Sequence, residues 1–320
     1  MKRRKFLQNT IATGSLVGLG GLPLISCNSK TEKTITILHT NDVHSHIEVF
    51  PDNHSKYPNI GGVARRASLI EGVRSENPNT LLLDAGDIFQ GTPYFNYFGG
   101  EVEFKMMSTL GYDAATIGNH DFDNGIDGLE KQLPHASFDF LISNYDFKNT
   151  ILNGRTKPYR IFNIDGIKIG VFGLGIKLDG LVDPKLFKET IYLDPIETAQ
   201  EMGQLLKTNE QCDLVICLSH LGYYYKKTPD RISDLNLAKK TKNIEIDVML
   251  RGEKVSRNGD VFKVGNKTFM TIRNIPHTKL DIVKCSVSSE KIAIPDPRNR
   301  KKAIAVNNPA FPNTYNYIVT

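Results

Sequence analysis

The sequence predicts an α/β fold, because strand-like and helix-like segments alternate along most of its 320 residues. Apolar runs with the length of buried strands occur at residues 34–39, 80–84, 114–117, 139–143, 167–174, 213–218 and 245–250. Helical patterns lie between many of them, at about residues 60–75, 98–110, 195–208 and 231–240. Segments that alternate in this way are typical of parallel sheets covered by helices.

The first expected helix, near residues 60–75, has both an apolar face and a stop signal. Val63, Ala67 and Ile70 recur at helical spacing. Asn77-Pro78 then ends the pattern, because a residue before proline is disfavoured in a helix.

Turn signals mark the later strands. Asp165-Gly166 between two apolar runs predicts a hairpin over residues 162–172. After residue 250, Asn258-Gly259 and Gly265-Asn266 separate short alternating strands, and we expect no further helix.

The first 26 residues have the composition of an export signal rather than of a folded segment. Lys2-Arg3-Arg4-Lys5 contains the twin arginines of Tat signals, and an apolar stretch follows. Leu24-Ile25-Ser26-Cys27 resembles the lipobox of bacterial lipoproteins; the alternative is an ordinary cysteine near a cleavage site. We therefore expect a Tat-like lipoprotein signal over 1–26, lipidation of Cys27, and a periplasmic or cell-surface protein anchored to a bacterial membrane.

Removal of this signal also changes the charge. Residues 1–26 carry four basic residues and no acidic one, so the formal net charge falls from +5 to +1. The basic balance of the whole chain thus does not indicate a nucleic-acid partner. The three remaining cysteines are expected to be core thiols; in one continuous strand Cys212 and Cys217 would point to opposite faces.

The rest of the chain is expected to form one domain. Residues 27–33 would be a tether, and no linker, repeat or low-complexity run interrupts residues 34–290. Residues 291–320 are basic and contain several prolines, which indicates a loosely held tail.

Metal-binding residue types follow four of the expected strands. They are Asp42 and His44, Asp87, Asn119 with His120, and His220. Because ligand sites gather at the carboxyl ends of strands in α/β sheets, these residues are expected to converge. Carboxylate, amide and imidazole donors suit two divalent ions that share one carboxylate.

These motifs resemble those of the calcineurin-like metallophosphoesterases, and within them the catalytic domain of bacterial secreted 5′-nucleotidases. The resemblance rests on four runs: HTNDVH at 39–44, GDIFQG at 86–91, GNHDFD at 118–123 and Ser219-His220. It implies a four-layer α/β/β/α sandwich and two divalent ions such as Mn²⁺, Zn²⁺ or Mg²⁺.

The resemblance also implies individual roles. Asp42 and His44 would bind one ion, Asn119 and His220 the other, and Asp87 would bridge them. His120 would serve as general acid at the leaving oxygen, oriented by Asp123. Asp121 is the alternative partner of His120, but adjacent side chains usually diverge.

The sequence departs from the family at a late Gly-His-x-His run, where it has Glu253 and Val255 in place of the histidines. A carboxylate can coordinate a hard cation, whereas valine cannot. Glu253 is therefore either a metal ligand or a solvated loop acid, and His277 is a further candidate replacement.

The function expected from these observations is an exported, metal-dependent phosphomonoesterase, with 5′-nucleotides as substrates. The alternative is a degenerate relative that binds phosphate, a nucleotide or a partner chain without efficient turnover. The chain ends near the place where two-domain nucleotidases begin their C-terminal domain, so a separately encoded partner domain is conceivable.

Overall fold

The computed structural model describes residues 33–244, except residue 56, and seven strand segments between residues 246 and 319. Side chains are described for residues 35–244, again except residue 56. The predictions that concern Cys27, Glu253, Val255 and His277 lie outside the described residues.

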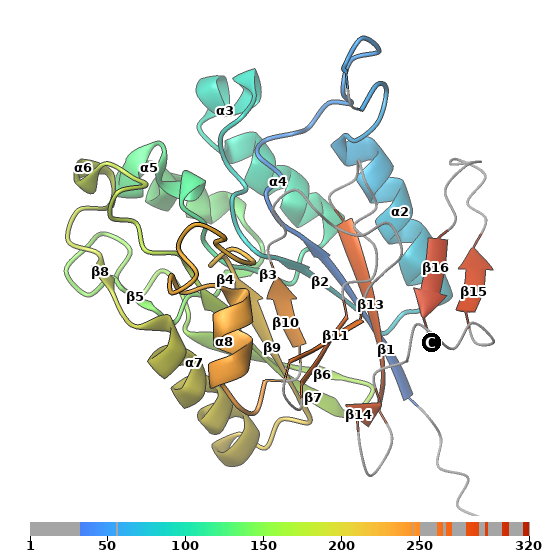
Figure 1. The fold of residues 1–320 in the computed structure, drawn as a ribbon. Coiled ribbons are helices and arrows are strands. Elements are labelled where there is room, and N and C mark those ends of the chain that lie inside the picture. The colour runs from blue at the N-terminus through green and yellow to red at the C-terminus, as the bar shows by residue number, and fades with distance from the viewer. Residues whose placement is uncertain are drawn as a thin grey trace, which may run out of the picture. The chain divides into compact units, whose positions relative to one another are not determined.

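The larger sheet has the strand order β14-β13-β1-β2-β3-β4. Its parallel part consists of β1 (Lys33–Thr40), β2 (Thr80–Asp84), β3 (Ala114–Ala115) and β4 (Asp139–Phe140). On the other side of β1, the sheet continues with two antiparallel strands, β13 (Leu280–Val287) and β14 (Ile292–Ala293). Figure 1 shows β1 and β2 side by side at the centre of this sheet.

The second sheet has the order β10-β9-β7-β6. Its parallel strands are β7 (Ile167–Leu174), β9 (Leu214–Ser219) and β10 (Ile246–Met249), and β6 (Tyr159–Ile164) is antiparallel to β7. The predicted hairpin is confirmed: Ile164 pairs with Ile167, and Asp165 and Gly166 between them have φ values of 51° and 75°. Positive φ at both positions is the requirement of a type I′ two-residue hairpin turn.

The helices have the following bounds. They are α2 (Val63–Glu76), α3 (Pro93–Phe98), α4 (Glu101–Leu110), α5 (Gly125–Gln132), α6 (Pro184–Phe187), α7 (Pro195–Gln204) and α8 (Asp234–Lys240). Two 3₁₀ turns, η1 (His120–Phe122) and η2 (Leu133–His135), and the π turn η3 (Leu205–Asn209) complete them. Three two-stranded antiparallel pairs lie outside the main sheets: β5 (Tyr145–Asp146) with β8 (Ile191–Tyr192), β11 (Val261–Val264) with β12 (Lys267–Met270), and β15 (Ala303–Val306) with β16 (Asn316–Val319).

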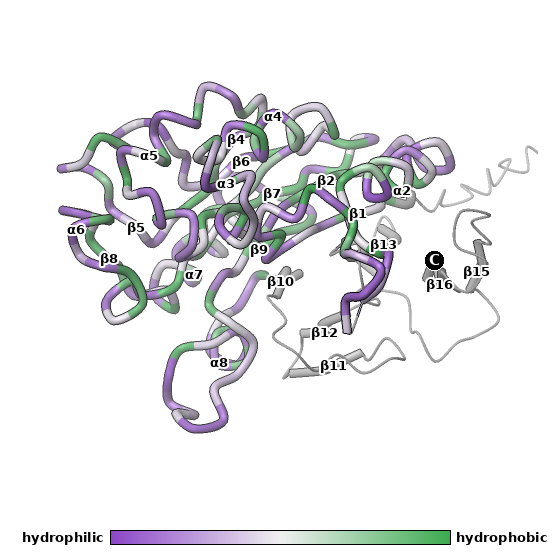
Figure 2. Tube along the Cα trace, turned by 90° about the horizontal axis from the view of Figure 1, so that it is seen from above, coloured by the Kyte–Doolittle hydropathy of each residue, from purple (hydrophilic) through white to green (hydrophobic). Residues whose placement is uncertain are grey.

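Three hydrophobic clusters fill the spaces between helices and sheets. In β1, Ile35 and Ile37 join residues of β7 and β9 in a cluster between the two sheets, whereas Leu38 joins a cluster with α2, α4 and α5. In the second sheet, Phe172 and Cys217 belong to a third cluster with α7 and α8. β1, β7 and β9 thus bury both faces, because successive side chains alternate. Figure 2 shows the corresponding hydrophobic stretches along β7 and β9. This packing is what an α/β/β/α sandwich requires; the four-layer detail itself stays a prediction.

Several details differ from the sequence-based expectations. The buried face of α2 contains Arg66, Leu69, Ile70 and Val73, so it is rotated from the predicted face. The helix expected at 98–110 is α4, which begins only at Glu101, because Gly99 and Gly100, with φ values of 64° and 106°, separate it from α3.

The cysteines also differ from the expectation. Cys212 and Cys217 are buried in the same cluster instead of on opposite faces. The reason is that β9 begins at Leu214, so Cys212 precedes the strand. In the part of the chain that the structure describes, no helix combines the length and the apolar character needed to cross a bilayer.

Candidate metal centre

The predicted ligands come together where the chain leaves the parallel strands. Asp42 follows β1, Asp87 follows β2, and His220 follows β9 directly. Their candidate donor atoms all lie within 4.8 Å of one another. Residues from both sheets thus meet at one point, although 178 positions separate Asp42 from His220.

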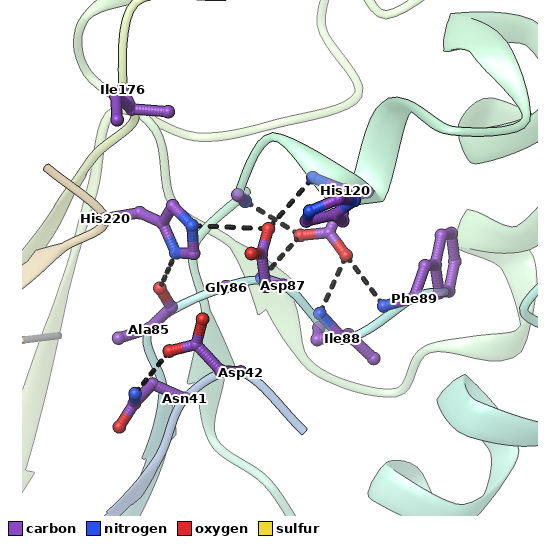
Figure 3. Close-up of polar contacts among 12 residues, drawn as sticks. Asn41, Asp42, Ala85, Gly86, Asp87, Ile88, Phe89, His120, Ile176 and His220 are labelled. Atoms are coloured by element: carbon purple, nitrogen blue, oxygen red, sulfur yellow. Dashed lines mark hydrogen bonds and ion pairs between the residues drawn. The ribbon is translucent and has the colours of Figure 1, made fainter. Parts of the chain in front are cut away.

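Asp87 lies at the centre of this group and is 4% exposed. Its Oδ1 accepts a hydrogen bond from the backbone N–H of His120 at 2.9 Å and lies 3.2 Å from Nε2 of His220. Its Oδ2 lies 3.7 Å from Nε2 of His44. The carboxylate therefore has one oxygen towards each of two histidines, as Figure 3 shows for His220. A bridging ligand needs this arrangement.

The buried ring of His220 is held in a fixed orientation. Its Nδ1 donates to the carbonyl oxygen of Ala85 at 2.7 Å, which leaves Nε2 directed at Asp87. A ligating histidine usually donates its other N–H in this manner. Burial alone would lower the pKa of His220, but the carboxylate of Asp87 outweighs it and raises this pKa to about 10. The pocket therefore favours positive charge.

His44 and Asp42 form the second part of the group. His44 Nδ1 lies 3.2 Å from the carbonyl oxygen of Phe89, and its Nε2 lies 3.7 Å from Asp42 Oδ1. The side-chain amide of Asn41 donates to Asp42 Oδ2 at 2.5 Å, leaving Oδ1 towards His44. Asn41 was not among the predicted site residues; its place directly before Asp42 was the available signal.

His120 and Asp123 lie beside the ligand group and reach solvent. Nδ1 of His120 is 3.0 Å from Asp123 Oδ2, and the two side chains are 39% and 29% exposed. The His120 ring also packs edge-on against His44, with ring centroids 5.2 Å apart. This exposed imidazole could reach a substrate, and its partner is Asp123 rather than Asp121.

Asn119 occupies the expected loop. It precedes η1, lies between Gly118 and His120, and is partly exposed. Its backbone carbonyl accepts a hydrogen bond from Phe122 N–H at 3.2 Å. Asn119 as a ligand remains a prediction.

The ligand loops have unusual backbone conformations. Asp42, His44 and Asp87 have φ values of 48°, 48° and 57°, in the left-handed region. For residues with a Cβ this conformation costs free energy and is retained where surrounding contacts enforce it. Here the contacts are backbone hydrogen bonds between the two loops, from Asp42 N–H to Gly86 O at 3.0 Å and from His44 N–H to Asp87 O at 3.1 Å. The first two ligand loops are thereby held in register.

The chemistry of these donors fits a divalent cation. Two carboxylates and two imidazoles, each with Nδ1 at a backbone carbonyl, offer oxygen and nitrogen atoms without a thiolate, the donor set of Mn²⁺, Zn²⁺ and related ions. Asp87 is buried yet prefers the charged form: burial would raise its pKa, but His220, with smaller contributions from His44 and the His120 N–H, lowers it to about 2. A charged carboxylate at this depth calls for a positive partner.

The sequence profile of the calcineurin-like phosphoesterases matches residues 35–253 of the chain. The chain belongs to this family. A profile of a domain of unknown function also matches residues 213–320, and the two matches overlap. The family membership that the motifs predicted is thus confirmed, and so is the mixed α/β metallophosphoesterase fold.

Individual phosphoesterases of this family extend the comparison. A 5′-nucleotidase from the venom of the snake Gloydius brevicauda is 37% identical over 222 residues, which are 67% of this chain and 36% of that protein. The 5′-nucleotidase of Vibrio parahaemolyticus is 33% identical over 264 residues, 79% of this chain and 46% of that protein. The solved structure of the NAD nucleotidase of Haemophilus influenzae is 28% identical, with a TM-score of 0.67 over 83% of this chain and 49% of that one. This phosphoesterase chain therefore spans less than half the length of these relatives.

Proposed function

We propose that this chain is a metal-dependent phosphomonoesterase that acts on 5′-nucleotides. The observation that carries the proposal is the convergence of Asp42, Asp87 and His220, with the exposed His120–Asp123 pair at its edge. The names of the relatives support nucleotides as substrates.

In this proposal Asp42 and His44 would hold one ion, Asn119 and His220 would hold the other, and Asp87 would contribute to both. Two bound divalent ions would supply Lewis acidity for the phosphate oxygens and lower the pKa of a bound water. As general acid, the His120 ring would carry a proton on each nitrogen: Nδ1–H donates to Asp123, and the proton on Nε2 is the one available for transfer. It donates this proton to the leaving oxygen, and the Asp123 carboxylate orients the ring and stabilises its charged form.

The experiment is an assay of the purified protein, after treatment with EDTA and re-addition of Mn²⁺, Zn²⁺ or Mg²⁺. Substrates are nitrophenyl phosphate, AMP and glycerol phosphate, and Asp87→Asn is the matched control for contaminating phosphatases. We expect metal-dependent release of phosphate, with AMP preferred over glycerol phosphate. Binding of phosphate or AMP without turnover would instead support the degenerate relative.

The replaced histidines lead to a second, finer proposal. Their position follows β10, whose last residue, Met249, is in register with Ser219 directly before His220. We propose that Glu253 joins Asn119 and His220, whereas Val255 leaves the ion at Asp42 and His44 with fewer protein donors. Calorimetric titration with Mn²⁺ should then show two unequal sites, and the double variant Glu253→His, Val255→His should tighten the weaker one. Two equal tight sites in the parent would contradict this assignment.

Export and anchoring are proposed from residues 1–27. The Tat-like signal and Cys27 after Leu-Ile-Ser support a lipoprotein on the outer side of a bacterial membrane. Cys27→Ala should move the protein from the detergent phase to the aqueous phase in a Triton X-114 partition. An unchanged distribution would exclude the acyl anchor. A separately encoded nucleotidase domain stays a possible partner, to be tested by co-purification.

A further inference from the structure

Asp121 is a buried carboxylate on which four backbone N–H groups converge. Oδ2 accepts from Gly118 at 2.7 Å and from Asp87 at 3.1 Å. Oδ1 accepts from Ile88 at 2.8 Å and from Phe89 at 3.1 Å. The bonds from Ile88 and Phe89 are dashed in Figure 3. The side chain is 1% exposed, and three of its four donors belong to the loop that carries Asp87.

The hydrogen bonding between these two loops is reciprocal. Asp121 accepts from the backbone N–H of Asp87, and the carboxylate of Asp87 accepts from the backbone N–H of His120 at 2.9 Å. We name residues 86–89 and 118–121 together the carboxylate clasp. Each carboxylate in it is fixed by the backbone of the other loop.

The clasp closes tightly because glycines stand where the loops touch. A Cβ on Gly118 would lie 2.2 Å from Asp87 Oδ1, and one on Gly86 would lie 2.6 Å from the backbone nitrogen of Gly118. Both distances are below any real contact of a Cβ. Asp87 therefore has little room to move while Asp121 holds the loop.

We propose that Asp121 is a positioning residue that acts through Asp87: it fixes the bridging carboxylate against His220 and so sets the affinity for divalent metal. This inference rests on the proposed metal-dependent function. Its physical basis is that both carboxylate oxygens are needed, each for two N–H donors. Asparagine has one oxygen, so its amide N–H₂ would face two further donors and push the loop away.

The test compares Mn²⁺ binding by calorimetry in the wild-type protein, Asp121→Asn and Asp113→Asn. Asp113 is the control, since it is a partly buried acid that also accepts a backbone N–H, from Leu82 at 2.8 Å, but it precedes β3 at the end away from the ligands. We expect Asp121→Asn to weaken Mn²⁺ binding about 10- to 100-fold, as loss of an outer-shell partner does. Asp113→Asn should lose stability, but its Mn²⁺ affinity should stay within about twofold of the wild-type value, a much smaller change than the one expected for Asp121→Asn.

Two further measurements separate positioning from folding. The visible spectrum of bound Co²⁺ should change in Asp121→Asn and not in Asp113→Asn, because it reports ligand geometry. If Asp121→Asn does not fold, Asp121→Ala takes its place, since it removes the four acceptor contacts without adding a donor. An unchanged Mn²⁺ affinity and Co²⁺ spectrum in the folded variant would overturn the inference.

These readouts need no turnover. A wild-type protein that binds Mn²⁺ but hydrolyses none of the phosphate esters would count against the proposed function, and the comparison of Asp121 with Asp113 would still decide the present inference.

Discussion

His120→Ala should slow turnover strongly while leaving metal binding intact. The reason is that the side chain and the backbone N–H of His120 have different partners. Its ring is hydrogen-bonded to Asp123, whereas its backbone N–H donates to Asp87 at 2.9 Å. Alanine removes the first contact and keeps the second. The bridging carboxylate therefore retains its support.

The magnitude follows from the loss of a general acid, about 10²- to 10⁴-fold in kcat. At 1.36 kcal/mol for each factor of ten, this is roughly 3 to 5 kcal/mol in the activation barrier. Asp123→Ala should have a smaller effect on kcat, of about tenfold, because the imidazole remains and loses only an orienting hydrogen bond. A hydrogen bond to a charged group contributes about 1.5 to 3 kcal/mol when it is buried, and less at a partly exposed site such as this one.

The assay compares two leaving groups. The leaving group of AMP is the 5′-alkoxide of adenosine, which needs a proton. The leaving group of nitrophenyl phosphate is nitrophenolate, which is stable without one. His120→Ala should therefore lose far more activity on AMP than on nitrophenyl phosphate, with equal Mn²⁺ content by elemental analysis. Equal losses on both substrates, or an empty metal site in the variant, would refute the role derived for His120.

Four other substitutions have direct structural expectations. Gly118→Ala should lower Mn²⁺ affinity more than about tenfold, measured by calorimetry, because its Cβ would lie 2.2 Å from Asp87 Oδ1. Gly166→Ala should lower the free energy of unfolding by about 1 to 2 kcal/mol, because φ at this position is 75°. Gly72→Ala should raise it by about 0.5 to 1 kcal/mol, because Gly72 lies inside α2 and an added Cβ would have no atom within 4 Å. Urea titrations measure both changes. Burial raises the pKa of Asp84 from its usual 3.8 to about 7, so the folded state binds this proton more tightly than the unfolded state does. The Asp84 carboxyl therefore lowers the free energy of unfolding progressively as the pH rises from about 4 to about 7. Asp84→Asn should remove that loss, so in metal-free urea titrations the variant should gain on the wild type at pH 8 relative to pH 4; an equal difference at both pH values would contradict the assignment.

The sequence was sufficient to predict the elements that have a strong local signal. The expected strand at 167–174 coincides with β7, and the expected strands at 80–84 and 34–39 coincide with β2 and, within two residues, β1. Long apolar runs buried on both faces leave little ambiguity. The helices α5 and α6 were missed because they are short and together contain two glycines and one proline, and α3 because it is a brief aromatic segment.

The site was predictable as a set of ligand types and less so as a geometry. Asp42, Asp87 and His220 were found because chemically distinctive residues follow apolar strands. The part played by Asp121 was not visible, because its partners are backbone N–H groups, which any sequence provides. The carbonyl oxygens of Ala85 and Phe89, which orient the two histidines, were hidden for the same reason.

The pairing of β1 with β13 has a consequence for shortened forms of this protein. The family match ends at residue 253, yet all eight residues of β1 are paired with residues 280–287. A chain terminated at 253 would turn a central strand into an edge, with the sequence KTITILHT presenting a row of unsatisfied N–H and C=O groups. Strands of this composition recruit further copies of themselves. Shortened chains that keep every proposed ligand, Glu253 included, should therefore precipitate, and solubility should return when residues 254–293 are restored.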